Sequence, residues 1–171
     1  MYRQWLASIL IASAPVVALA QAPATQKPAA PATQKPAAAA PAAAKGVRTI
    51  EIIGTDDMKY SVANIEAKAG EQIRIRLTSK GAMPKIAMAH NFVLLAKAAD
   101  TLKFVNASAM ARATDFVPPD MKAQVIAHTA LAGAGETVEV TFKVPAAGTY
   151  TYLCTFPGHF QAGMRGTLTV K

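Results

Sequence analysis

Four side chains in this sequence have the chemistry of ligands for a soft metal ion. Cys154, His159 and Met164 fall within one stretch of eleven residues, Cys-Thr-Phe-Pro-Gly-His-Phe-Gln-Ala-Gly-Met, and His90 lies far upstream in Met-Ala-His-Asn-Phe. Two histidines and one cysteine in a plane, with a long axial methionine, are the ligand set of copper electron-transfer sites. Sulfur favours Cu(I), and imidazole accepts both oxidation states. The joint spacing predicts one copper ion held by these four residues.

Taken singly, each of these residues also has a structural explanation. A lone cysteine is usually a small buried hydrophobe, and a lone histidine is more often structural than metal-binding. The third histidine, His128, is expected to be exposed and to have no ligand role. The other methionines are too widely and irregularly spaced for the methionine cluster of a copper carrier, and fit the core and the rim of the site better: Met58, Met83, Met88, Met110 and Met121.

The segments that must position the ligands alternate between apolar and polar residues, which predicts strands with one face in a core. Regular alternation occurs at residues 47–53, 72–77, 137–142 and 166–170, and less regular strands are expected at 59–62, 91–95, 123–127 and 149–154. Residues 98–113 lack alternation and are rich in Ala, Leu and Met, so a short helix is expected there. About eight strands of this kind predict an antiparallel sandwich.

The N-terminal part of the chain differs in composition from the rest. Residues 1–20 have the pattern of a secretory signal peptide, with Arg3, an apolar stretch and Ala-Leu-Ala before Gln21. A retained membrane anchor is the alternative, although Pro15 interrupts the run and a span takes roughly 20 apolar residues. Residues 21–45 repeat Pro-Ala-Thr-Gln-Lys-Pro-Ala-Ala and are expected to form a linker, either a spacer from a membrane or a solubilising tail. The domain is expected at 46–171.

Charge and cysteine content narrow the function classes. Residues 46–171 contain fourteen Lys and Arg against ten Asp and Glu, a net charge of +4, and the basic residues are scattered. A nucleic-acid footprint would be clustered, so no nucleic-acid partner is expected. Cys154 is the only cysteine, which excludes an intrachain disulfide. Free thiols are attacked in an oxidising compartment, so in a secreted or periplasmic protein this sulfur is either buried and inert or occupied by a metal.

Over most of residues 47–171 the chain resembles the cupredoxins, and azurin and the auracyanins in particular. The resemblance is carried by Ala-His-Asn-Phe at 89–92, Val-Ile-Ala-His-Thr-Ala-Leu-Ala-Gly-Ala-Gly-Glu at 125–136, the loop 154–159 and Gly-Thr-Leu-Thr-Val at 166–170. It implies an all-β Greek-key sandwich of about eight strands with one short helical insertion. It also implies a type 1 copper ion with His90, Cys154 and His159 as equatorial ligands and Met164 as the axial ligand, and single-electron transfer between redox proteins.

The resemblance assigns further roles around the copper. The carbonyl of Ala89 would face the ion opposite the methionine, Asn91 would connect the two ligand loops, and the amide of Phe156 would donate to the cysteine sulfur. The chain departs from azurin in having four residues between His159 and Met164, as in auracyanins and plastocyanins, where azurin has three. It also has Ala89 where the family usually has glycine.

The family resemblance implies a monomer that docks its redox partners at an apolar surface around His159. That surface would include Phe156, Pro157, Phe160, Met83 and Pro84. Separately, the N-terminal tail is the expected route by which the protein would lie near a membrane. An alternative function is that of a periplasmic copper carrier or copper-homeostasis protein, which needs more exchangeable ligands. An enzyme is not expected, because multicopper oxidases and copper nitrite reductases need additional histidines for a second copper centre and this chain has three in all.

Overall fold

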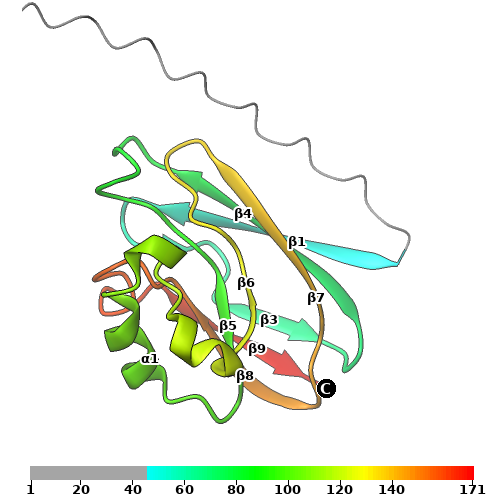
Figure 1. The fold of residues 1–171 in the computed structure, drawn as a ribbon. Coiled ribbons are helices and arrows are strands. Elements are labelled where there is room, and N and C mark those ends of the chain that lie inside the picture. The colour runs from blue at the N-terminus through cyan, green and yellow to red at the C-terminus, as the bar shows by residue number, and fades with distance from the viewer. Residues whose placement is uncertain (1–45) are drawn as a thin grey trace, which may run out of the picture. The chain divides into compact units, whose positions relative to one another are not determined.

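The computed structural model describes residues 46–171, which form two β-sheets and one short α-helix (Figure 1). The expected signal peptide and linker lie outside the described residues. The strands are β1 (Val47–Thr55), β2 (Lys59–Tyr60), β3 (Asn64–Ala67), β4 (Gln72–Lys80), β5 (Val93–Leu95), β6 (Val125–His128), β7 (Thr137–Lys143), β8 (Gly148–Leu153) and β9 (Arg165–Val170). No helix in this part of the chain is long and apolar enough to cross a membrane.

The two sheets pack face to face around one apolar core. One sheet has the strand order β2-β1-β4-β7, and the other has the order β3-β9-β8-β5-β6. Alternate residues of β4, among them Ile73, Ile75 and Leu77, are buried and meet Tyr152 and Leu168 from the opposite sheet. This is the period-two burial that the alternating sequence predicts. The expectation of an all-β sandwich of about eight strands with one helical insertion is confirmed.

The expected antiparallel sandwich is corrected in one respect, because both sheets are mixed. β1 pairs with β4 in parallel over nine residues, from Val47↔Gln72 to Thr55↔Lys80, and β3 pairs with β9 in parallel. The cause is the path of the chain: after β1 and β2 it crosses to the other sheet to form β3 and returns for β4. Alternation reports which face of a strand is buried but not the direction of its neighbour. The sequence also left β3 unassigned.

A second apolar cluster lies on the other face of the five-stranded sheet. β5 is buried on both faces, and Val93 and Leu95 pack with Phe104 of α1 (Thr101–Ser108) and with Leu153. The helix is shorter than the expected 98–113. Its first turn is capped by the Asp100 side chain, which accepts from the amide of Lys103. It is followed by two 3₁₀ turns, η1 (Arg112–Thr114) and η2 (Pro119–Gln124).

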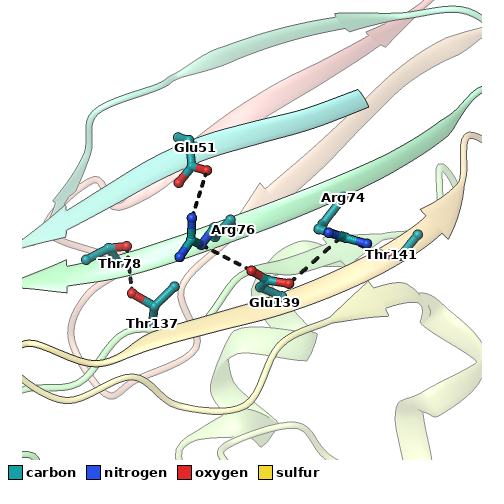
Figure 2. A network of polar contacts seen from close by, with 7 residues as sticks. All are labelled: Glu51, Arg74, Arg76, Thr78, Thr137, Glu139 and Thr141. Carbon is teal, nitrogen blue, oxygen red and sulfur yellow. Dashed lines mark hydrogen bonds and ion pairs between the residues drawn. The ribbon is translucent and has the colours of Figure 1, made fainter. Parts of the chain in front are cut away.

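The outer face of the four-stranded sheet carries a ladder of polar side chains (Figure 2). Glu139 of β7 lies between two arginines of β4, with Arg76 Nε at 3.1 Å and Arg74 Nε at 3.9 Å. Arg76 also reaches Glu51 of β1, at 3.5 Å. The residues of these cross-strand pairs alternate along β4 with the residues that face the core, so they lie on the other face of the sheet. This face is the solvated side of the sandwich.

Candidate metal centre

The loop between β8 and β9 brings three of the four predicted ligands to one end of the five-stranded sheet. Cys154 directly follows β8, and Met164 directly precedes β9. The neck of the loop is closed by hydrogen bonds from the amide of Cys154 to the carbonyl of Met164, at 3.1 Å, and from the amide of Met164 to the carbonyl of His159, at 2.9 Å. Antiparallel pairing of β8 with β9 therefore fixes the separation of these ligands.

His90 reaches the same place from a different part of the chain. Its amide and carbonyl exchange hydrogen bonds with Ala132, at 2.9 and 2.7 Å, just before β5 begins. Because β5 pairs with β8, through Val93↔Leu153, the histidine lies beside the cysteine loop. Two distances define the cluster. Nδ1 of His159 lies 3.3 Å from Nδ1 of His90 and 3.4 Å from Sγ of Cys154.

The three donor atoms converge in a site closed to water. The ligand atoms of His90, Cys154 and His159 all lie within 4.8 Å of one another. The exposed fraction is 0% for His90 and Cys154 and 2% for His159. Burial raises the pKa of the Cys154 thiol to about 12, and it lowers the pKa of His159 to about 4, with His90 as a second cause. Burial also lowers the pKa of His90, although Asp56 opposes that shift.

Met164 lies against the same wall of the site as His90. Its side chain is fully buried. A Cβ built on Gly54, at the site end of β1, would come within 3.0 Å of the Met164 Cε and 2.8 Å of the His90 Cδ2. The glycine therefore leaves the space that the thioether and the imidazole share. The structure thus brings together all four residues that the sequence singled out.

Asn91 connects the two ligand segments, as the family resemblance implied. Its side-chain nitrogen donates to the Thr155 hydroxyl, at 2.8 Å, and to the carbonyl of Asp115, at 2.9 Å. Its side-chain oxygen accepts from the Thr155 amide, at 2.9 Å. Since Asn91 follows His90 and Thr155 follows Cys154, these bonds fix one ligand segment against the other.

The donor set fits a soft or borderline transition metal. One thiol sulfur and two imidazole nitrogens in an apolar, water-free site suit copper, and the neighbouring thioether adds the weak fourth donor that copper electron-transfer sites have. A family model described as copper binding proteins, plastocyanin/azurin family, matches residues 48–171. The chain belongs to this family. The predicted copper cofactor is confirmed by the family match together with the grouping of the two histidines and the cysteine.

Similar proteins include auracyanins and azurins. Auracyanin-B of Chloroflexus aurantiacus is 39% identical over 125 residues, which cover 72% of this chain and 52% of that protein. The chain thus spans about half the length of this relative. Azurin of Pseudomonas aeruginosa is 40% identical over 128 residues, covering 72% of this chain and 84% of that protein. The solved structure of auracyanin A, a "blue" copper protein of Chloroflexus aurantiacus, aligns with a TM-score of 0.66 at 36% identity, covering 74% and 100% of the two chains.

The amide of Phe156 lies where the cupredoxin resemblance placed it, and the carbonyl of Ala89 lies near the same sulfur. The carbonyl of Ala89 lies 3.9 Å from Sγ of Cys154, and Ala89 is fully buried. The amide of Phe156 donates to the cysteine sulfur and holds the pKa of the thiol below the value that burial alone would give. The amide of Asn91 acts in the same way. Two N–H groups therefore aim at the sulfur of this copper-family site.

Phe160 does not lie in the apolar surface where it was expected. It is 8% exposed and packs with Phe104 and Leu153 in the cluster under α1, and Arg165 lies over its ring at 4.9 Å. The ligand loop folds into tight turns after His159, which directs Phe160 inward and not toward solvent. His128 is exposed at the end of β6, outside the group of possible metal ligands, as expected.

Sequence reasoning missed the residues of β1 and β2 that bracket the site. Gly54 makes room for two ligands, and its partner in the strand pair, Tyr60, donates from its hydroxyl to the carbonyl of Asn91. Lys59 donates to the carbonyl of Ala162 in the ligand loop. The glycine at the end of an alternating strand was the available signal, because a strand glycine often marks a close approach. Nothing in the local sequence connects Lys59 to a loop about a hundred residues away, or Tyr60 to Asn91, 31 residues away.

Proposed function

We propose that the protein is a type 1 copper protein that shuttles single electrons between redox partners. In this proposal His90, Cys154 and His159 are the equatorial ligands and Met164 is the axial ligand. The observation that supports it most strongly is the convergence of one sulfur and two imidazole nitrogens within 4.8 Å in a buried site. Bound copper would supply a Cu(I)/Cu(II) couple that accepts and releases one electron.

The surrounding residues hold the ligands in one arrangement for both oxidation states. Strands β5, β8 and β9 fix the ends of the segments that contain the ligands, and the hydrogen bonds of Asn91 prevent the two ligand segments from separating. Exclusion of water removes solvent molecules that would have to reorient when the charge changes. A rigid, dry site of this kind favours rapid electron transfer over chemistry on a bound substrate, so we propose that the protein is not an enzyme.

The alternative function, a copper carrier, would need ligands that a second protein can approach. The fully buried Cys154 and His90, and His159 at 2% exposed, support retention of the metal. The dissociation rate of Cu(I) into an excess of chelator separates the two functions. We expect release over hours or longer at neutral pH, and release within seconds would favour the carrier.

We propose that redox partners dock at the apolar surface near His159. The ring of Phe156 lies 4.8 Å from the imidazole, between it and Phe116. Pro157, the residue after Phe156, is exposed, and in the segment that leads to His90, Pro84 is exposed and Met83 is 42% exposed. Small, weak interfaces are typical of redox encounters, and an apolar contact near a ligand brings two metal centres close.

The electron self-exchange rate tests this docking surface. Met83→Lys would place like charges face to face in the encounter of two molecules, so we expect exchange to slow by about tenfold at low ionic strength, with an unchanged visible spectrum. Gln72→Lys is the matched control, because Gln72 is exposed at the opposite end of the nine-residue β4, roughly 25 Å away. Equal slowing by both variants, or by neither, would exclude this surface.

We also propose a secreted or periplasmic location, with the domain at residues 46–171. The signal-like residues 1–20 and the linker-like residues 21–45 support this proposal, as does a single cysteine held in a buried site. The test is the N-terminal sequence of the protein isolated from its native source. Cleavage after Ala20 is expected. A retained Met1 in protein from the membrane fraction would contradict cleavage and support the anchor, and a retained Met1 in cytoplasmic protein would contradict the location.

A further inference from the structure

Tyr60 of β2 touches the peptide that follows a proposed copper ligand. Its hydroxyl donates to the backbone carbonyl of Asn91 at 2.5 Å. Burial raises the pKa of Tyr60 well above its ordinary value, and the nearby Cys154 adds to the shift. The hydroxyl therefore stays protonated and remains a donor. Tyr60 pairs with Gly54 of β1, which lies next to the side chains of His90 and Met164. This pairing fixes the backbone of Tyr60 beside the site.

Asn91 has a partner for each of its polar groups, and all but two of these bonds lead to the cysteine segment. Its amide donates to Sγ of Cys154, and its side chain exchanges bonds with Thr155. The remaining two are the bond to the Asp115 carbonyl and the bond from Tyr60. The bond from Tyr60 restrains the main-chain carbonyl of Asn91. By restraining this carbonyl it also restrains the orientation of Asn91, whose amide donates to the Cys154 sulfur.

We propose that Tyr60 is a positioning residue for the copper thiolate: its hydroxyl holds Asn91 so that the Asn91 amide stays aimed at the Cys154 sulfur. The inference rests on the proposed function, since it takes Cys154 as a ligand. A hydrogen bond to a thiolate is charge-assisted and stabilises negative charge on sulfur. That charge is larger when the copper is reduced, so a well-aimed amide favours Cu(I) and raises the reduction potential.

Tyr152 provides a matched control in the same core. It is fully buried, and its hydroxyl donates to the carbonyl of Val62 at 2.6 Å. The two tyrosine rings lie 5.7 Å apart. Removing either hydroxyl leaves one carbonyl without its donor in a part-buried hydrogen bond, so the cost in stability is of the same kind. Val62, however, has no hydrogen bond to a proposed ligand among the described contacts.

The experiment compares Tyr60→Phe with Tyr152→Phe in the copper-loaded full chain. Three quantities are measured: the reduction potential, the Cu–S stretching frequency by resonance Raman, and the unfolding midpoint of the metal-free protein. We expect both variants to lower the midpoint, and only Tyr60→Phe to lower the potential and raise the Cu–S frequency. The inference is overturned if Tyr60→Phe leaves potential and frequency unchanged, or if Tyr152→Phe shifts them equally.

A second substitution covers the case in which Tyr60→Phe fails to fold. Site-specific replacement of Tyr60 by 3,5-difluorotyrosine keeps the ring and strengthens the hydroxyl as a donor, so the potential should rise. A fall or no change would overturn the inference. The proposed function is tested separately by the wild-type protein. If the wild-type protein is blue but the Tyr60 variants do not change the reduction potential or the Cu–S frequency, only the role of Tyr60 is rejected. If the wild-type protein is colourless, the ligand set itself is rejected.

Discussion

The acid–base state of Cys154 is governed by its burial. The pKa of the thiol rises to about 12, although the amides of Asn91 and Phe156 act in the opposite direction. The neighbouring imidazoles are neutral near pH 7, because burial lowers the pKa of His159 to about 4 and lowers that of His90 as well. The metal-free centre therefore carries one displaceable proton, on sulfur, and a bound metal ion has to replace it.

Copper affinity should accordingly depend on pH. Between pH 7 and 8 the thiol is protonated and both histidines are neutral, so binding of Cu(I) releases about one proton and the affinity rises about tenfold per pH unit. Competition with a Cu(I) chelator of known affinity at several pH values measures the slope. A slope near zero would show that the thiol is already ionised in the metal-free protein.

The role of Met164 as axial ligand can be tested by the reduction potential of the copper-loaded protein. A thioether favours Cu(I), whereas an amide oxygen favours Cu(II). Met164→Gln should therefore keep the visible charge-transfer band and lower the potential by at least ~60 mV, which corresponds to a tenfold relative gain in Cu(II) binding. Met110→Gln, at a residue 89% exposed, is the control and should change nothing. An unchanged potential in Met164→Gln would mean that its sulfur does not contact the metal.

At the scale of the strands, the outer ladder of the four-stranded sheet contributes to stability through Glu139. Its carboxylate lies between Arg74 and Arg76 and is only 19% exposed. Glu139→Ala would leave two like charges close together on β4, so we expect a loss of about 1 kcal/mol in the free energy of unfolding. Glu66→Ala is the control, because its pair with Lys171 is about 70% exposed and should contribute much less. Equal losses, measured by chemical denaturation, would contradict this view of the ladder.

The strands and the grouping of the proposed ligands could be predicted from the sequence, because both depend largely on local patterns. Alternation in β4 and β7 follows from burial of one face, and the spacing of Cys154, His159 and Met164 follows from a single loop. The parallel pairing of β1 with β4 was not predictable, since it depends on where β3 goes.

Other features of the site depend on contacts between distant segments. The contact of Tyr60 with Asn91 joins residues 31 positions apart, and no local pattern indicates it. Phe160 was misplaced for a similar reason. Its loop has no regular period, and its packing under α1 depends on an element that precedes it by about fifty residues.

At the scale of the whole molecule, the domain and the preceding segment should be energetically independent. Residues 46–171, the part of the chain that the structure describes, contain the sandwich core and the grouped candidate ligands. Residues 21–45 are rich in Ala and Pro and have almost nothing to bury in a core. Deleting them should leave the unfolding midpoint, the visible spectrum and the reduction potential unaltered. A marked fall in the midpoint, measured by circular dichroism, would show that this segment stabilises the domain.

The visible and EPR spectra of the purified protein after loading with Cu(II) provide the most direct measurement of a copper–thiolate centre. A buried thiolate bound to Cu(II), with two imidazoles beside it, should give intense blue or blue-green absorption and a narrow copper hyperfine splitting. Cys154→Ala should abolish both signals, and His128→Ala, at an exposed histidine outside the site, should leave them unchanged. A colourless wild-type protein with an ordinary wide splitting would contradict the proposed ligand set and the electron-transfer function built on it.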